Sequence, residues 1–328
     1  MYSGRGPLAR SAVRAAAVLA ALALVHTASA QYPSKPIRYV VSFPPGGIAD
    51  ITARVVAPKL AEALGQPVVV EQRVGAGGNI GAEAVARAEP DGHTLLSATP
   101  PVAIAQSMYR NLRFNPRRDL APVALIGDVP NILVVGASSP VKTLRDLIEF
   151  ARRNPGKLNY SSLGAGTSVH LAAELFKYQA KVFIVHIPYR GAPQAMMALL
   201  AGEVDMMMDA LPPSIAQVRA GRTRALAVTS ARRAPQLPDV PTVAESGFPG
   251  FEVTGWVGIS TTAGTPPATI ARLEAEIGKA IANPEVASLL ERQGMALRFL
   301  GAKEFGAFID AEIAKFAVAV KYSGAAVD

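Results

Sequence analysis

The 328-residue chain has no cysteine, only one tryptophan and four histidines. Without cysteine it can form no disulfide, carries no thiol nucleophile and has no cysteine for a lipid anchor. The histidines (His26, His93, His170 and His186) lack the spacing of metal ligands, and His-Glu-x-x-His and Gly-x-Ser-x-Gly motifs are missing. We therefore expect no metal, no cofactor and no enzymatic activity.

Charge is also sparse. Charged residues make up 18% of the chain, and the formal net charge is +8. Arginine pairs such as Arg117-Arg118, Arg152-Arg153 and Arg232-Arg233 are isolated from one another. Nucleic-acid-binding surfaces combine basic stripes with interleaved aromatic residues, and no such pattern occurs. We expect no nucleic-acid partner.

The longest apolar run lies within the first thirty residues. Three arginines precede an apolar segment from Ala15 to Val25, which is short for a membrane span, and Ala28-Ser29-Ala30 provides a small-residue cleavage site. The pattern predicts a signal peptide over residues 1–30, cleaved after Ala30. The alternative is an uncleaved membrane anchor. We expect an exported, periplasmic protein with no direct membrane insertion.

A strand-to-helix turn follows the predicted cleavage site. Residues 37–43 are apolar and β-branched, whereas apolar residues from Ile48 to Leu64 recur at helical spacing. Between them lie Gly46 and Gly47, whose backbone N–H groups and helix dipole favour an anion. Phe43, Gly46, Gly47 and Asp50 are therefore candidate ligand-binding residues. A tight glycine turn without a ligand is the alternative.

Strands and helices then alternate. Strands are predicted at 67–73 and 94–99, with a helix at 80–88 between them, which indicates parallel βαβ units. The chain crosses into a second lobe near residue 128 and returns near 251. There, strands are expected at 158–162, 182–189, 204–211 and 225–230, followed after the return by a strand at 251–260 and helices at 267–282, 284–293 and 302–322.

This rhythm predicts an α/β fold with two Rossmann-like lobes. Lobe 1 comprises residues 31–128 plus 252–328, and lobe 2 comprises residues 129–251. Ligands of open parallel sheets bind beyond the carboxyl ends of the strands. We expect a ligand cleft between the lobes.

The second lobe contains a similar turn. A strand at 158–162 leads into Gly164, Ala165 and Gly166, and Thr167 then precedes a helix. A hydroxyl beside free N–H groups suits a carboxylate, although plain helix capping explains Thr167 equally well. His170 is also a candidate, with orientation of other site residues as the more common role for such a histidine.

Further candidates lie at strand ends. Thr99 ends the strand at 94–99, Tyr189 and Arg190 follow the strand at 182–189, and Asp209 lies near the end of a methionine-rich strand. For the methionines, core packing is the favoured interpretation. For Arg190, a surface ion pair is the alternative.

The chain resembles the Bug (TctC-like) receptors of the tripartite tricarboxylate transporter family. The resemblance rests on the joint order of motifs along almost the whole mature chain: Tyr32 to Arg38, Phe43 with Gly46-Gly47 and Asp50, Gly75 to Gly81, Pro90 to Leu96, Gly164 to His170, Tyr189 to Gly191, Gly202 to Asp209, and Asp239 to Gly247.

The resemblance implies a type II periplasmic-binding-protein fold, in which two lobes close on a ligand like a Venus flytrap. It also implies that the two glycine turns grip a ligand carboxylate through backbone N–H groups and ordered water. The chain departs from the usual family motifs at two places, both outside the glycine turns. It has Gln72-Arg73-Val74-Gly75 in place of Asn-Arg-Pro-Gly, and His93 in place of tyrosine.

The expected partners are a small organic carboxylate and the large and small integral membrane subunits of the transporter. A sensor kinase is the alternative partner, since the same lobe closure would serve signalling. We expect a monomer. An exported enzyme is a further alternative, for which no motif is found.

Overall fold

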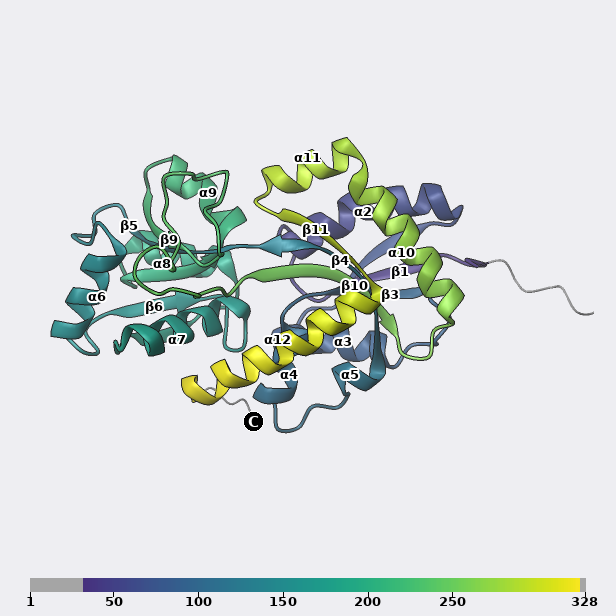
Figure 1. Cartoon of the computed structure of the whole chain (residues 1–328), viewed down its shortest axis with the longest axis horizontal. Helices are drawn as coiled ribbons and strands as arrows, with labels where there is room; N and C mark the ends of the chain where they lie inside the picture. Colours follow the sequence, from purple (N-terminus) through teal and green to yellow (C-terminus); the bar gives the residue numbers. More distant parts are fainter. Residues whose placement is uncertain (1–31, 325–328) are drawn as a thin grey trace, which may run out of the picture.

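The computed structural model describes residues 32–324, so the predicted signal peptide and its cleavage site lie outside the described residues. Two β-sheets lie side by side, with helices covering their faces (Figure 1). Within residues 32–324, no helix is both long enough and apolar enough to cross a membrane.

The first sheet contains six strands in the order β11-β4-β10-β3-β1-β2. Strand β1 pairs in parallel with β2 and β3, which confirms the predicted βαβ units, and β10 is antiparallel to β3 and β4. The strands are β1 (Ile37–Val41), β2 (Val68–Gln72), β3 (Thr94–Ala98), β4 (Leu120–Val129), β10 (Gly255–Thr262) and β11 (Ala296–Gly301). The helices of this part of the chain are α2 (Ile48–Leu64), η2 (Ala76–Gly78), α3 (Asn79–Ala86), α4 (Pro101–Met108), α5 (Pro116–Asp119), α10 (Pro267–Ala282), α11 (Pro284–Arg292) and α12 (Ala302–Ser323).

The second sheet contains five strands in the order β7-β6-β8-β5-β9. Strand β6 is parallel to β7 and β8, whereas β5 is antiparallel to β8 and β9. The strands are β5 (Asn131–Gly136), β6 (Asn159–Ser162), β7 (Val185–Pro188), β8 (Met206–Ala210) and β9 (Thr223–Val228). The helices are α6 (Leu144–Arg153), α7 (Ser168–Ala180), α8 (Ala192–Ala201) and α9 (Leu211–Arg219).

Two chain segments connect the sheets, one between β4 and β5 and the other before β10. Buried side chains tie them together: Asn131 Nδ2 donates to Val253 O at 2.9 Å, and Thr229 Oγ1 donates to the same oxygen at 2.6 Å. Val129 and Gly255 are also register partners. The lobe boundaries at residues 128 and 251 remain a prediction. The contacts between the two connecting segments support it.

Several elements differ from the sequence-based expectation. Helices α4 and α5 were not expected, and β11 lies where only a link between helices was expected. Conversely, helix α10 has the predicted bounds. Residues 235–251 contain neither helix nor strand, as their proline content indicates.

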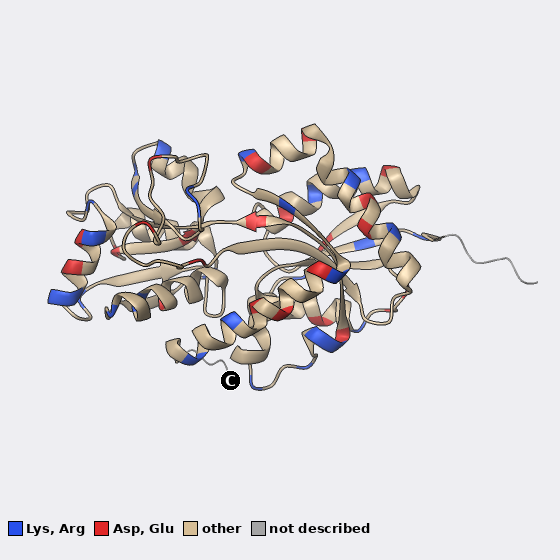
Figure 2. Cartoon of the chain, in the orientation of Figure 1, with Lys and Arg blue, Asp and Glu red and all other residues tan. Residues whose placement is uncertain are grey.

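The apolar core runs through both lobes. One cluster of buried side chains includes Val40 and Leu96 of the first sheet, Leu133 and Tyr160 of the second, and Phe316 of α12. Helix α12 contacts both α4 and α7 and crosses from one lobe to the other (Figure 1). The charged residues lie mostly on helices and loops, with both signs interspersed (Figure 2).

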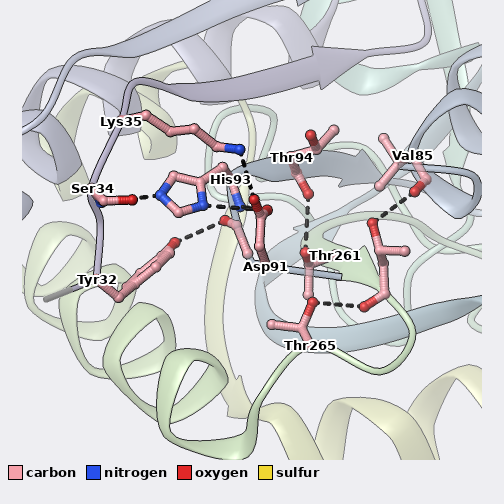
Figure 3. A network of polar contacts seen from close by, with 11 residues as sticks. Tyr32, Ser34, Lys35, Val85, Asp91, His93, Thr94, Thr261 and Thr265 are labelled. Atoms are coloured by element: carbon pink, nitrogen blue, oxygen red, sulfur yellow. Dashed lines mark hydrogen bonds and ion pairs between the residues drawn. The ribbon is translucent and has the colours of Figure 1, made fainter. Parts of the chain in front are cut away.

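Polar contacts fix the amino end of β3 (Figure 3). Tyr32 donates its hydroxyl proton to Gly92 O at 2.8 Å, Ser34 N–H donates to His93 Nε2 at 3.2 Å, and Lys35 pairs with Asp91 at 2.8 Å. Because β3 runs away from these residues, His93 lies at the edge of the sheet opposite to the predicted ligand site.

Candidate functional site

Three helices begin at the carboxyl edge of the parallel strands in the first lobe. Helices α2, α3 and α4 follow β1, β2 and β3, and their N-cap residues are Gly47, Gly78 and Pro100. None of these N-termini has a side chain that caps it. The first N–H groups of a helix have no partner within the helix, and its N-terminus carries partial positive charge. This edge is therefore suited to an anion.

Asp50 shapes the first glycine turn from inside α2. Its carboxylate accepts hydrogen bonds from Gly46 N at 3.0 Å, Arg54 Nε at 2.9 Å and Gln72 Nε2 at 3.0 Å. Burial alone would raise the pKa of Asp50, but the hydrogen bonds from Arg54, Gly46 and Gln72 together hold it below its ordinary value. Asp50 thus supports the turn by accepting a backbone N–H.

This contact changes the expected role of Gly46. Its N–H is taken by Asp50, so the N–H groups open to a ligand begin after it. Gly46 and Gly47 are exposed, and a Cβ at Gly46 would meet no atom within 4 Å. The turn therefore faces open space.

Two buried polar groups beside this turn were missed from the sequence. Ser42 Oγ and Asn79 Nδ2 are buried, and neither has a hydrogen-bond partner within the described part of the chain. A Cβ at Gly81 would collide with Ser42 Oγ, and one at Gly78 would lie 3.2 Å from the Phe43 ring. Ser42, Phe43 and Gly78 therefore lie together, and Asn79 follows Gly78 as the first residue of α3. Because unpaired buried polar groups are costly, they mark a place where a ligand or water is expected.

The second glycine turn connects β6 to α7. Thr167 Oγ1 donates to Gly164 O at 2.8 Å and accepts from His170 N at 3.4 Å, so Thr167 caps the helix as predicted. Gly164 (φ +121°) and Gly166 (φ +81°) adopt backbone conformations that disfavour other residues. Ala165 lies between them in the same turn.

His170 lies behind this turn. Its Nδ1 accepts from Gly166 N at 3.3 Å, and its side chain is buried. Burial, and to a smaller extent Lys177, lower the pKa of His170 to about 4. The imidazole is therefore neutral at pH 7 and orients the turn, the role that the sequence favoured.

The strand-end residues occupy different environments. Tyr189 N donates to Ser162 O at 3.1 Å, so Tyr189 lies beside the second turn. Arg190 is exposed and makes no ion pair among residues 32–324, so the expected alternative of a surface ion pair is not seen. Thr99 is buried, and its carbonyl accepts from Val102 N as α4 begins.

Asp209 is fully buried at the end of β8. It accepts from Ala210 N at 2.8 Å and Ser214 Oγ at 2.7 Å, and burial raises its pKa to about 7 despite these two bonds. In this conformation its carboxyl group supports the start of α9 and is not open to a ligand.

Contacts through α4 link the two turns. A Cβ at Gly166 would lie 2.6 Å from Met108 Sδ, at the end of α4. The next residue, Tyr109, donates its hydroxyl proton to Ala76 O at 3.2 Å, beside Gly78. The second turn is thus brought to the first lobe through α4, and within residues 32–324 no backbone hydrogen bond joins the two glycine turns.

The arrangement offers anion-binding groups rather than catalytic ones. Among the residues described, no cluster of three or more His, Cys, Asp or Glu could hold a metal ion. Ser162 Oγ does lie 2.6 Å from His186 Nε2, the spacing of a nucleophile and its base. However, Ser162 is fully buried and also bonds Gly164, so no substrate reaches its hydroxyl.

Two mixed sheets in two lobes, with uncapped helix N-termini at a shared strand edge, define a solute-binding protein of the periplasmic-binding-protein type. The chain belongs to the tripartite tricarboxylate transporter family of receptors, whose family model matches residues 52–324. The family and the fold predicted from the motifs are thereby confirmed.

Known relatives agree with this assignment. BugT of Bordetella pertussis is 37% identical over 296 residues, which cover 90% of this chain and 91% of BugT. A solved R. palustris protein with adipate has a TM-score of 0.84 at 35% identity and covers 90% of this chain and 99% of its own. MatC from Rhodopseudomonas palustris with bound malate has a TM-score of 0.80 at 31% identity, covering 88% and 100%. BugD, another similar solved structure, is a periplasmic binding protein.

Proposed function

We propose that this receptor captures a small organic acid through a carboxylate group and delivers it to a tripartite tricarboxylate-type transporter. The observation that carries the proposal is the group of three uncapped helix N-termini next to the unpartnered Ser42 and Asn79. Solved relatives with adipate and malate support the same ligand class.

The proposed grip uses both lobes. On the first lobe it includes Phe43, Gly47, Asn79 and Ser42, with Gly46, Asp50 and Thr99 shaping the edge. On the second it includes Gly164, Ala165, Gly166 and Thr167, with His170, Tyr189 and Arg190 beside them, whereas the closed-off carboxyl group of Asp209 takes no part. Ordered water and backbone N–H groups would replace bulk hydration of the carboxylate as the lobes close.

Delivery sets the proposed cellular context. After cleavage at Ala30 the receptor acts in the periplasm, and its closed form docks on the large and small membrane subunits. Deleting the gene should abolish uptake of the radiolabelled ligand. Unchanged uptake, with loss of a transcriptional response to the same ligand, would point instead to a sensor kinase as the partner.

Isothermal titration calorimetry tests the ligand class. We expect binding of at least one acid from a panel of mono-, di- and tricarboxylates, amino acids and aromatic acids that includes adipate and malate. The corresponding amide, such as adipamide for adipate, should not bind, because it carries no negative charge. If no acid in the panel binds, the proposed ligand class is wrong.

Thr167→Val tests the second-lobe side of the grip. It should weaken carboxylate binding by about 1–3 kcal/mol, because it leaves a buried polar group without its partner. Thr143→Val is the matched control, since Thr143 caps α6 in a capping box remote from the glycine turns. The control should lose about 1 kcal/mol of stability but no affinity. Equal affinity of the two variants would remove Thr167 from the site.

A further inference from the structure

Three side chains, from the end of β6 and the start of α7, hold the polar groups of the second glycine turn. Gly164 N donates to Ser162 Oγ at 3.2 Å, and Gly166 N donates to His170 Nδ1 at 3.3 Å. Thr167 Oγ1 donates to Gly164 O at 2.8 Å. Because both glycines have positive φ, the shape of the turn depends on these bonds.

Behind the turn, three rings form a continuous stack. The His186 ring from β7 lies 4.2 Å from the His170 ring and 4.7 Å from the Tyr160 ring, with interplanar angles of 23° and 21°. His186 Nε2 also lies 2.6 Å from Ser162 Oγ. His186 therefore contacts both side chains that hold the glycine N–H groups.

A partly buried ion pair lies at the far end of the stack. Glu174 Oε1 accepts from Tyr160 Oη at 2.6 Å and from Lys177 Nζ at 2.6 Å. Lys177 disfavours positive charge on both histidines, His170 disfavours it on His186, and Glu174 favours it on His186. Burial, the larger cause, lowers the pKa of both histidines to about 4.

The bonds also fix hydrogen positions. His170 Nδ1 accepts a hydrogen bond, so in the neutral ring the proton is on Nε2. Ser162 accepts from Gly164 N, and its one proton has two acceptors in reach, His186 Nε2 at 2.6 Å when that nitrogen is unprotonated and Gly164 O at 3.3 Å. Protonating His170 Nδ1 would remove the acceptor of Gly166 N, and protonating His186 Nε2 would remove the nearer acceptor of the Ser162 proton.

We propose that Ser162 and His186, acting with His170, are positioning residues that hold the second glycine turn in its ligand-binding shape while both imidazoles are neutral. The inference rests on the proposed carboxylate-binding function only for its effect on affinity. Its effect on the turn is independent of any ligand.

Two substitutions of His186 separate its contacts. His186→Phe keeps the ring stack but loses Nε2, whereas His186→Gln places a polar group near the Nε2 position. With the acid found by calorimetry as ligand, His186→Phe and Ser162→Ala should bind about tenfold more weakly, or about 1.4 kcal/mol. His186→Gln should recover most of that loss. Equal weakening in His186→Phe and His186→Gln would assign the effect to packing and overturn the proposal.

The pH profile tests the neutral state. Affinity should be constant from pH 8 to pH 6.5 and fall towards pH 4, while circular dichroism shows a folded protein. His170→Asn supplies an acceptor oxygen near the Nδ1 position without a titratable group. It should therefore bind more tightly than His170→Leu and should show a shallower acid limb than the wild type. An acid limb of unchanged depth in His170→Asn would contradict the role of His170.

Amide hydrogen exchange reads the turn without a ligand. The Gly164 and Gly166 amides should exchange at least tenfold faster in Ser162→Ala and His186→Phe than in the wild type. His93→Phe is the matched control, because this buried histidine also accepts a backbone N–H but lies at the opposite edge of the first sheet (Figure 3). Unchanged exchange in both variants overturns the proposal. If exchange is faster in the variants but the protein binds no acid, the positioning role of Ser162 and His186 still holds. Only the proposed carboxylate-binding function is then rejected.

Discussion

Two aspartates at helix starts show how single residues here depend on their neighbours. Asp50 and Asp209 are both buried, and both accept a backbone N–H next to a glycine turn or strand end. Arg54 reaches Asp50, whereas no cation reaches Asp209 among the residues described. The pKa of Asp50 is therefore lowered, and burial raises that of Asp209 to about 7. One residue type thus serves as a fixed anion in one lobe and a readily protonated group in the other.

Asp209→Asn should change the pH dependence of stability. The folded protein holds the Asp209 proton up to about pH 7, whereas the unfolded chain releases it near the ordinary aspartate pKa of 3.8. The contribution of this proton to stability is therefore complete below about pH 4 and is lost as pH rises to 7. Asparagine can still accept from Ala210 N and carries no charge. The difference in free energy of unfolding between the variant and the wild type is therefore expected to depend on pH. From pH 4 to pH 8 it should shift in favour of the variant by on the order of 2–4 kcal/mol.

Urea unfolding of both proteins between pH 4 and pH 8 measures this difference. Ser214→Ala is a useful companion variant, since it removes a hydrogen bond to the same carboxylate and should lower stability more at pH 8 than at pH 4. Parallel profiles for Asp209→Asn and the wild type would show that Asp209 is not protonated in the folded state at neutral pH.

At the scale of elements, the starts of α2 and α3 look alike in sequence but differ in backbone. Their N-cap residues are both glycines, but Gly47 has φ −79° and Gly78 has φ +99°. A Cβ at Gly47 would meet only Pro44 O at 3.8 Å, whereas at Gly78 it would lie 3.2 Å from Phe43. Only the second of these helix starts requires glycine.

Replacing each of these glycines with alanine tests the distinction. Gly47→Ala should leave the free energy of unfolding unchanged or raise it by up to about 1 kcal/mol, because alanine restricts the unfolded chain. Gly78→Ala should lower it by about 1–3 kcal/mol, the cost of a strained left-handed residue. Thermal unfolding of the two variants side by side measures the difference. Equal effects would contradict the assigned backbone conformations.

The same elements show what sequence patterns can predict. The strand and helix around Gly46-Gly47 were predicted because strand and helix periodicities meet there, and α10 because proline opens an amphipathic run. Strand β11 was missed because its side chains are mostly exposed, which leaves no alternation to detect. Ser42 and Asn79 were missed because an isolated polar residue carries no pattern. Their significance lies in burial without a partner, which only the packed chain shows.

At the scale of the whole molecule, the two lobes share one apolar cluster. Phe305 and Phe316 of α12 belong to it together with Phe176 of α7 and Met108 of α4. At the far end of α12, the Tyr322 ring stacks on Tyr178 of α7 at 4.1 Å. The two connections are joined as well, through Asn131 and Val253. The lobes are thus bound by packing along α12 in addition to the connecting segments.

This continuity predicts that the lobes unfold together. Multi-domain proteins often unfold in more than one step. A single transition is expected here because the two lobes share one apolar cluster. Trp256, the one tryptophan of the chain, is buried on β10 in the first lobe, where it donates to Glu312 of α12 at 3.1 Å. Its fluorescence reports the first lobe, whereas far-ultraviolet circular dichroism reports both. The two urea midpoints should coincide, and Tyr322→Ala should lower both together, because it removes the ring stack between α12 and α7. A circular-dichroism transition that precedes the loss of Trp256 fluorescence would show that the second lobe unfolds alone and that α12 does not couple the lobes.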